Sequence, residues 1–230
     1  MALQDDIKEG VTEIFRDQWS VRDGTVVPQP DSVRLNNDAV RLEGTVLYAD
    51  LSESTRLVDK EPPEFAAEIY KAYLRTAARI IATEGGEITA YDGDRIMAVF
   101  IGKAKNTTAV RCGLKINWAR QHIINPALKA QYSTKTYQLK QTVGIDTSTL
   151  FIARTGIRGA NDLVWVGRAA NHAAKLSGLS ADSPTWISEA VYDGMHESAK
   201  FTDGKSMWQE RRWTQMDDAR VYCSTWVWPV

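Results

Sequence analysis

The 230-residue chain has 43% hydrophobic residues, which is enough for one sizeable hydrophobic core. Its 28 Lys and Arg residues are balanced by 29 Asp and Glu residues, so overall charge gives no attraction to nucleic acid or to an anionic membrane. The sequence also lacks an apolar stretch approaching the roughly 20 residues of a membrane span, and its acidic N-terminus is unlike a signal peptide. We therefore expect a cytoplasmic protein with no membrane or nucleic-acid partner. The only cysteines, Cys112 and Cys223, are expected to be reduced thiols.

The first 40 residues predict a helix followed by an irregular arm. Apolar residues recur at steps of three and four from Leu3 to Phe15, which indicates one amphipathic helix. Residues 23–37 contain Pro28 and Pro30 and few periodic apolar positions, as a linker does. We therefore divide the chain into an N-terminal helix and arm, 1–40, and one main domain, 41–230.

The main domain begins with a strand and, further along, a hairpin that each carry an aspartate. The β-branched and apolar run 45–49 predicts a buried strand that ends at Asp50. Two short apolar strands flank Asp92-Gly93, a strong hairpin signal, and Asp94 follows at once. The other predicted elements are helices at 62–86, 104–124 and 168–179, and strands at 139–145, 149–153, 163–166 and 221–226.

This order of elements is β-α-β-β-α-β with extra C-terminal strands and an N-terminal helix. It predicts an α+β fold of the ferredoxin-like type, in which a sheet containing antiparallel strands has its helices packed on one face. In such a sheet Asp50 and Asp94 would lie side by side. Two close carboxylates repel unless a cation joins them, and hard oxygen ligands suit Mg²⁺ or Mn²⁺. On pattern alone, both aspartates are better explained as turn residues or helix caps than as metal ligands.

Three segments resemble, in order and spacing, the motifs of the class III nucleotidyl cyclases, the family of adenylyl and guanylyl cyclases. Residues 48–55 (YADLSEST) are similar to the family's first metal-binding strand and turn, and residues 93–100 (GDRIMAVF) are similar to its second. Residues 166–176 (VGRAANHAAKL) are similar to the start of its catalytic helix. The resemblance covers Arg41 to about Ser188, and residues 219–226 are similar to the family's closing strand. The main domain is therefore identified as a class III cyclase catalytic domain.

The resemblance implies the roles of individual residues. Asp50 and Asp94 would bind two divalent ions, Mn²⁺ or Mg²⁺, together with the backbone carbonyl of Leu51. Asn171 would orient the ribose, and Lys175 would take the place of the family's transition-state arginine. The residues that would surround the β- and γ-phosphates are Ser52, Glu53, Ser54 and Thr55. Where the family has a triphosphate lysine, the late segment WQERRW offers Arg212 or Arg211.

Both positions that read a purine base in the family have lost their polar side chains. Ala90 and Val164 stand there, so a purine nucleotide would find no hydrogen-bonding partner. One explanation is loss of function. The other is a different base, because small bacterial members of this kind include the pyrimidine cyclases of the Pycsar antiphage systems, which make cyclic UMP or cyclic CMP as a signal for a separate effector protein.

Family sites lie between two catalytic domains, and this chain contains one, so the resemblance implies a homodimer with two equivalent sites. The leading hypothesis is therefore a dimeric cyclase that converts UTP to 3′,5′-cyclic UMP. Conversion of CTP to cyclic CMP is an alternative, and a second is a non-catalytic nucleotide-sensing domain that kept the fold. A polymerase-like palm shares the two-carboxylate arrangement, but the near-neutral charge argues against it.

Overall fold

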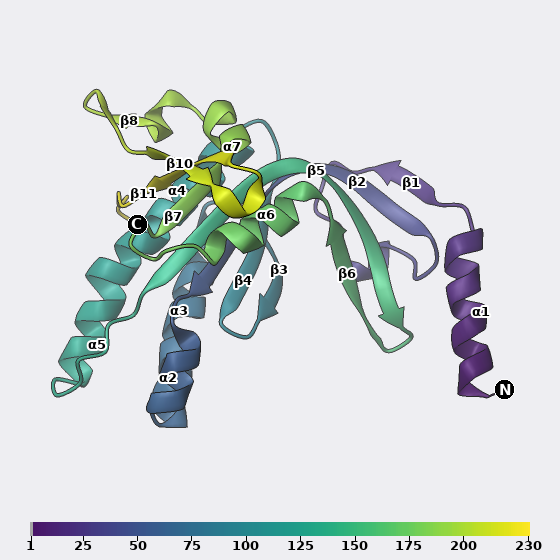
Figure 1. Ribbon diagram of the computed structural model, residues 1–230, viewed down its shortest axis with the longest axis horizontal. Helices are drawn as coiled ribbons and strands as arrows, with labels where there is room; N and C mark the ends of the chain where they lie inside the picture. The colour runs from purple at the N-terminus through teal and green to yellow at the C-terminus, as the bar shows by residue number, and fades with distance from the viewer. Residues whose placement is uncertain (1) are drawn as a thin grey trace. The chain divides into compact units, whose positions relative to one another are not determined.

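The computed structural model describes residues 2–230, and in it the chain forms two compact units. The smaller unit comprises the described residues up to Glu43 together with Thr149–Gly167, and the larger unit comprises Gly44–Ser148 and Arg168–Val230. Two long strands, β2 (Asp38–Leu51) and β5 (Gln141–Ile157), contribute residues to both units (Figure 1). Within residues 2–230, no helix is long and apolar enough to cross a membrane.

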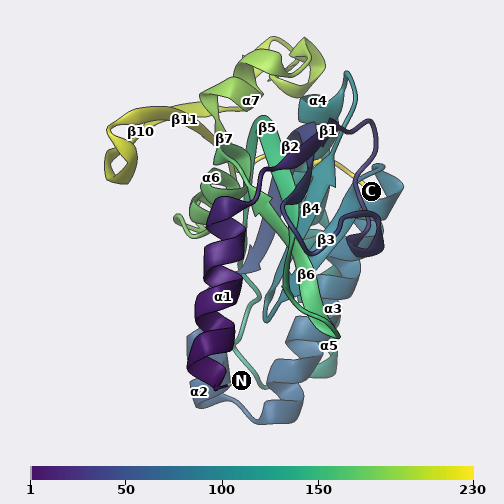
Figure 2. The ribbon, with the colours of Figure 1, turned by 90° about the vertical axis from the view of Figure 1, so that its right-hand side faces the viewer.

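The smaller unit contains the N-terminal helix and a strand hairpin. Helix α1 (Leu3–Arg16) has no buried residue, and its apolar side chains, from Leu3 to Phe15, are all exposed. Strand β1 (Ser20–Asp23) pairs in parallel with the start of β2, and it meets the arm predicted as irregular, 23–37, only at Asp23. Strand β6 (Ala160–Val166) turns back along the end of β5 as an antiparallel partner (Figure 2). A short 3-10 helix (Pro30–Ser32) completes this unit.

The larger unit is built on a sheet with the strand order β10-β11-β7-β5-β2-β4-β3. Its neighbouring strands β2 and β4, and β4 and β3, are antiparallel, whereas β5 and β7 are parallel. The helices of this unit are α2 (Ser54–Lys60), α3 (Pro63–Thr83), α4 (Lys105–Ala119), α5 (Asn125–Gln131), α6 (Arg168–Ser177) and α7 (Glu189–Gly194). Its remaining strands are β3 (Glu87–Asp92), β4 (Arg95–Phe100), β7 (Thr185–Ser188), β8 (Phe201–Thr202), β9 (Lys205–Ser206), β10 (Gln209–Trp213) and β11 (Ala219–Ser224).

Helices cover both faces of this sheet, which differs from the expectation that they pack on one face. Successive side chains of a strand point to opposite faces. On β5, Val143 and Ile145 face α4, where a side chain added at Gly113 would meet them. Gly144, between them, faces α6 instead. The sequence could not show this, because the α6 segment is too short to reveal which face it covers.

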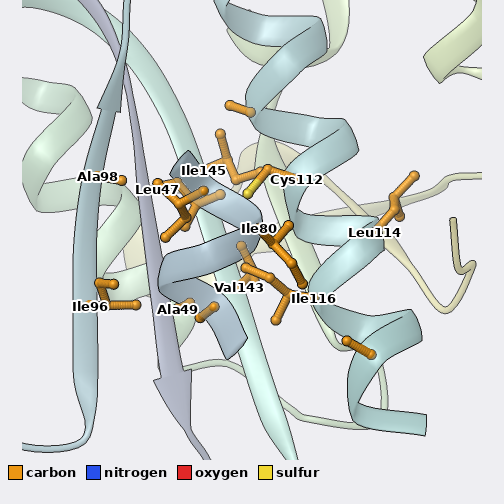
Figure 3. Close-up of a cluster of buried hydrophobic side chains, with 14 of the residues drawn as sticks. Leu47, Ala49, Ile80, Ile96, Ala98, Cys112, Leu114, Ile116, Val143 and Ile145 are labelled. Carbon is orange, nitrogen blue, oxygen red and sulfur yellow. The ribbon is translucent and has the colours of Figure 1, made fainter. Parts of the chain in front are cut away.

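The main core lies on the face covered by α3 and α4. Figure 3 shows Leu47 of β2, Ile80 of α3 and Ile145 of β5 together with Cys112 of α4. A second cluster on the α6 face contains Leu176, Trp186, Trp213, Val221 and Cys223. Both cysteines are free and buried, and burial raises the pKa of the Cys112 thiol far above its ordinary value.

Two segments differ in detail from their predicted elements. The strands expected at 139–145 and 149–153 are one continuous strand, β5, because its polar central residues are hydrogen-bonded inside the unit. The helix expected to end at 124 continues into α5 through a π-helical segment, Arg120–Ile124, in which the Asn125 N–H donates to the Arg120 carbonyl. This wider turn accommodates Pro126, which lacks an N–H and therefore favours the first turn of a new helix.

Candidate active site

The structure brings Asp50 and Asp94 together at one end of the sheet. Asp50 lies near the C-terminal end of β2, and Asp94 lies in the turn between β3 and β4. The two strands β2 and β4 pair so that Asp50 is opposite Arg95, and the Leu51 N–H donates to the Asp94 carbonyl at 3.4 Å. The fold therefore gathers two carboxylates and the Leu51 backbone at one place.

The surroundings of Asp50 disfavour its negative charge. Burial, and then the nearby Asp94 carboxylate, raise the pKa of Asp50 to about 7, although Arg95 opposes this shift. The wholly buried Tyr73 of α3 supports the same strand end, since its hydroxyl donates to the Asp50 carbonyl at 3.4 Å. A half-buried carboxylate beside another one is the arrangement that a bound cation would relieve.

A groove of about 580 Å³ opens over these two aspartates. Its wall on one side is the turn 51–55, which contains the predicted phosphate-binding residues Ser52, Glu53, Ser54 and Thr55. The groove is also lined by the end of α6 and the segment after it, with Ser177, Gly178, Leu179 and Ala181. All of these residues belong to the larger unit, so one chain forms this groove within a single compact body.

The turn 51–55 offers only part of its backbone to a ligand. The Ser52 N–H already donates to the Lys140 carbonyl at 3.0 Å, and the Ser52 hydroxyl lies 3.2 Å from the Thr142 hydroxyl. Ser54 and Thr55 begin α2, and the first N–H groups of a helix lack acceptors within it. These two N–H groups are thus better suited to bind phosphate oxygens than that of Ser52.

Asn171 and Lys175 lie on the exposed side of α6, one helical turn apart. Neither lines the groove of its own chain, whose wall begins only at Ser177. The Lys175 ammonium has one weak contact, to the Met216 sulfur at 3.5 Å. The structure therefore does not bring these two side chains onto Asp50 and Asp94 within one chain.

The remaining predicted site residues lie on strands β3, β6 and β10. Ala90 is half-buried on β3 opposite Met97 of β4. Val164 is 40% exposed on β6, in the smaller unit. Arg212 lies on β10, at one edge of the sheet, where it donates to the Asp218 carbonyl at 3.4 Å.

The donor set at the groove is small. Among residues 2–230, no group of three or more His, Cys, Asp or Glu side chains is arranged to hold a metal ion. What the groove offers a cation is the carboxylates of Asp50 and Asp94 and a backbone carbonyl at Leu51, because its third carboxylate, Glu53, is paired with Lys140. Such a set suits hard cations that keep waters and take further oxygen ligands from a substrate.

Comparison with known proteins gives the family. No protein-family model matches the sequence. The chain is 50% identical over 231 residues to a uridylate cyclase of Xanthomonas perforans, with 100% of both chains covered. It is also 51% identical over 232 residues to a uridylate cyclase of Burkholderia cepacia, again with 100% of both covered. The chain belongs to the uridylate cyclase family.

The prediction of a pyrimidine nucleotide cyclase is thereby confirmed at the level of the family. The fold of this uridylate cyclase family member also resembles the crystal structure of the guanylyl cyclase Cya2 with a TM-score of 0.69. That likeness covers 82% of this chain and 94% of the other at 19% identity. The predicted α+β cyclase fold with an additional N-terminal helix is confirmed.

The sequence patterns did not reveal two positively charged side chains next to the groove. Lys140 donates to the Glu53 carboxylate at 3.0 Å, and Arg56 lies 3.7 Å from the same carboxylate. The two positive charges therefore offset a negative charge in the turn predicted to bind phosphates. Lys140 is 87 residues from Glu53 in the sequence, so no local pattern could have revealed the pair.

Proposed function

We propose that the chain converts UTP to 3′,5′-cyclic UMP and pyrophosphate at a site shared by two copies of the chain. The observation that carries this proposal is the groove in which Asp50 and Asp94 meet, in a chain that matches uridylate cyclases over its full length. We further propose that cyclic UMP is a second messenger of bacterial antiphage defence and is read by a separate effector protein. The resemblance to the Pycsar cyclases supports this role.

Two divalent ions, Mg²⁺ or Mn²⁺, would be held by Asp50, Asp94 and the Leu51 carbonyl. The fit rests on the donor chemistry and on the repulsion between the carboxylates, which contributes to the raised pKa of Asp50. When bound, such ions lower the pKa of an attacking hydroxyl and stabilise negative charge on a phosphate. Arg95, opposite Asp50 on β4, keeps the free site from being purely negative.

In the proposed reaction the 3′-oxygen of UTP bonds to the α-phosphorus, and the bond to the oxygen bridging the α- and β-phosphates breaks. Pyrophosphate leaves, and the 3′-hydroxyl proton passes to solvent. The N–H groups of Ser54 and Thr55 would hold the terminal phosphates, while Asn171 would orient the ribose. Lys175 would place its positive charge beside the α-phosphate, where negative charge develops.

The proposed preference for a pyrimidine base rests on the absence of polar side chains at the two purine-reading positions. Ala90 and Val164 provide no hydrogen bond to a purine edge, so ATP and GTP would lose the polar partners on which strong discrimination depends. The two full-length relatives named uridylate cyclase support UTP over CTP. A tenfold preference needs only about 1.4 kcal/mol of differential transition-state binding.

The position of α6 supports the proposal of a shared site. Because Asn171 and Lys175 are exposed and lie outside the groove of their own chain, a second copy would supply them. A two-fold homodimer then has two equivalent sites, each with the aspartates of one protomer and the α6 residues of its partner.

The direct test is to incubate the purified protein with each of the four ribonucleoside triphosphates and Mn²⁺, and to separate the products by chromatography. We expect cyclic UMP, with at least tenfold less product from ATP and GTP. Equal turnover of ATP would contradict the base assignment, a preference for CTP would replace UTP as the substrate, and no product from any nucleotide would favour the non-catalytic alternative.

A further inference from the structure

A third aspartate, Asp146, lies in the middle of β5 and is wholly buried. Successive side chains of a strand point to opposite faces of the sheet, and the preceding residue, Ile145, faces α4. Asp146 therefore faces α6 rather than the main core. Its strand is tied to β2 beside it, because the Thr147 hydroxyl donates to the Gly44 carbonyl at 3.2 Å. A buried carboxylate must be compensated by charge and hydrogen bonds, and the identity of its partners indicates its role.

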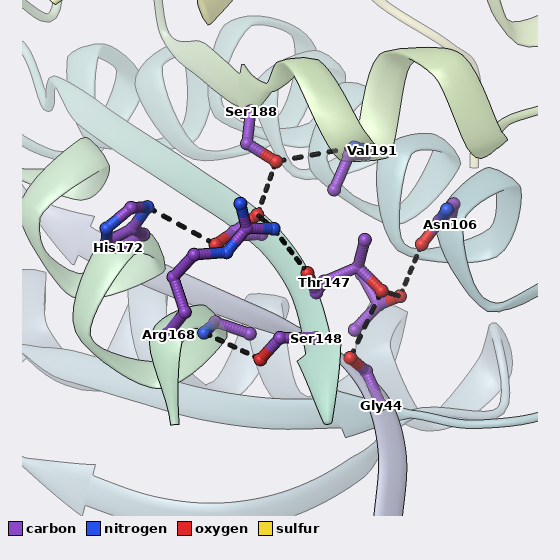
Figure 4. Close-up of polar contacts among 11 residues, drawn as sticks. Gly44, Asn106, Thr147, Ser148, Arg168, His172, Ser188 and Val191 are labelled. Atoms are coloured by element: carbon purple, nitrogen blue, oxygen red, sulfur yellow. Dashed lines mark hydrogen bonds and ion pairs between the residues drawn. The ribbon is translucent and has the colours of Figure 1, made fainter. Parts of the chain in front are cut away.

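Two partners of Asp146 come from α6: Arg168, its first residue, and His172, one turn further on (Figure 4). Its Oδ1 accepts a hydrogen bond from the Arg168 guanidinium at 3.2 Å and another from the Ser188 hydroxyl. Its Oδ2 has no hydrogen-bond partner in residues 2–230 but lies 3.4 Å from Nδ1 of His172. Arg168 and His172 are four residues apart, so they share one face of α6.

Arg168 is the charge partner of Asp146. Burial lowers the pKa of His172 below its ordinary value even though the Asp146 carboxylate opposes the shift. The imidazole is therefore neutral near pH 7, and the guanidinium of Arg168 provides the positive charge. Arg168 also donates to the Thr147 carbonyl at 2.8 Å, and the Ala169 N–H donates to the Ser148 hydroxyl at 3.0 Å.

The other end of α6 is fixed by a close backbone contact. A side chain added at Gly144 would come within 2.2 Å of the Ala173 carbonyl oxygen and within 2.4 Å of the Ser177 nitrogen. The helix thus sits directly on β5 at Gly144 and is held by polar contacts two residues further along the same strand. With both ends fixed, the outward direction of Asn171 and Lys175 is determined.

We propose that Asp146 is a positioning residue, which sets the rotation of α6 through Arg168 and His172 and thereby the placement of Asn171 and Lys175 against the substrate. This inference rests on the proposed function, because it assigns Asp146 to the same reaction. Asp146 itself touches no substrate atom. Its contribution is geometric, and a displacement of about 1 Å in a reacting group can lower a rate roughly 100-fold.

The test compares Asp146→Asn with Ser188→Ala. Asparagine keeps the shape and one acceptor oxygen of Asp146 but removes the charge that holds Arg168. Ser188→Ala removes a different hydrogen bond to the same carboxylate, and it also uncaps α7, since the Ser188 hydroxyl accepts from the Val191 N–H. It therefore disturbs the buried network without removing a hydrogen bond to α6.

For Asp146→Asn we expect kcat with UTP to fall at least about tenfold, with KM within about threefold of wild type. Hydrogen exchange should become faster in the first turn of α6. For Ser188→Ala we expect kcat within about twofold of wild type, even at an equal or lower Tm. Equal losses of kcat in the two variants, or an unchanged kcat in Asp146→Asn, would overturn the proposal.

Two further experiments cover a variant that does not fold and a wild-type protein that is inactive. If Asp146→Asn does not fold, Arg168→Gln should lose kcat and Arg168→Lys should recover most of it, whereas equal kcat in these two variants would overturn the proposal. If the wild-type protein cyclises no nucleotide, the proposed function fails. Hydrogen exchange then tests only whether Asp146 holds α6 in place, and unchanged exchange in Asp146→Asn would overturn the proposal.

Discussion

Asp50 and Asp146 lie on the neighbouring strands β2 and β5, and their carboxylates have opposite surroundings. Asp50 is half-buried beside another carboxylate, and its pKa is raised to about 7. Asp146 is fully buried, but a guanidinium and a hydroxyl compensate it within the unit. The comparison separates two uses of an acidic side chain: Asp50 is left short of positive charge, as a ligand for an added cation would be, whereas Asp146 is already paired and serves the fold around it.

The largest expected effect comes from breaking the first of these two sites. Asp50→Ala or Asp94→Ala should lower turnover at least about 1,000-fold, because the remaining carboxylate of the groove, Glu53, is paired with Lys140 and would not replace a lost ligand. Neither variant should lose stability in the absence of metal, since each removes one of two repelling charges. Turnover and Tm measured with and without Mn²⁺ check this.

The exposed Asp59 of α2 provides the matched control for this prediction. Asp59→Ala removes the same charge and volume outside the groove lining and should keep nearly full turnover. Retention of more than a few per cent of activity by Asp50→Ala would contradict the two-ion assignment.

Mixing two inactive variants tests whether the groove of one chain and the α6 residues of the same chain belong to two different active sites of the dimer. Homodimers of Asp50→Ala or of Asn171→Ala should be inactive. After subunit exchange, about half of the dimers should be heterodimers with one intact site, so activity should return to roughly a quarter of wild type. Mass measurement of tagged chains confirms the exchange. Background activity after verified exchange would place the whole site within one chain.

The pH dependence of metal binding gives a further test of Asp50 as a cation ligand. Because the pKa of Asp50 is raised to about 7, the folded metal-free protein holds a proton that the unfolded chain releases between about pH 4 and pH 7. Its stability contribution is therefore present below about pH 4 and is lost as the pH rises through 7. A bound cation replaces that proton, so the increase in Tm caused by Mn²⁺ should be larger at pH 8 than at pH 6. Asp50→Asn should abolish this difference, and an equal shift at both pH values in the wild type would be evidence against Asp50 as a ligand.

The smallest effect is expected at Glu53, where an exposed carboxylate neutralises Lys140. Glu53→Gln should lower the KM for UTP by about threefold by freeing positive charge for the terminal phosphates. Exposed ion pairs contribute roughly 0–1 kcal/mol, so unfolding in urea should show almost no change. Lys140→Ala is the companion variant, and a lower KM there would count against this role.

The sequence was sufficient to predict the two aspartates of the candidate site. It did not reveal the buried contacts that hold α6 on the sheet. Asp50 follows a β-branched run and Asp94 follows an Asp-Gly turn, so local signals placed both. Arg168 and Ser188, in contrast, are 22 and 42 residues from Asp146, and only the folded sheet joins them. For the same reason the polar residues 146–148 suggested a break between two strands, whereas their hydrogen bonds keep β5 continuous.

The two buried thiols described above make this protein convenient for spectroscopic labelling. Maleimide and similar reagents attack exposed thiolates, and Cys112 and Cys223 are both inaccessible, with the Cys112 thiol strongly held in its protonated form. A single cysteine introduced at an exposed position such as Asp59 should therefore react alone in the native protein. A fluorescent donor on one preparation and an acceptor on another would then report subunit exchange in real time, without replacement of either native cysteine.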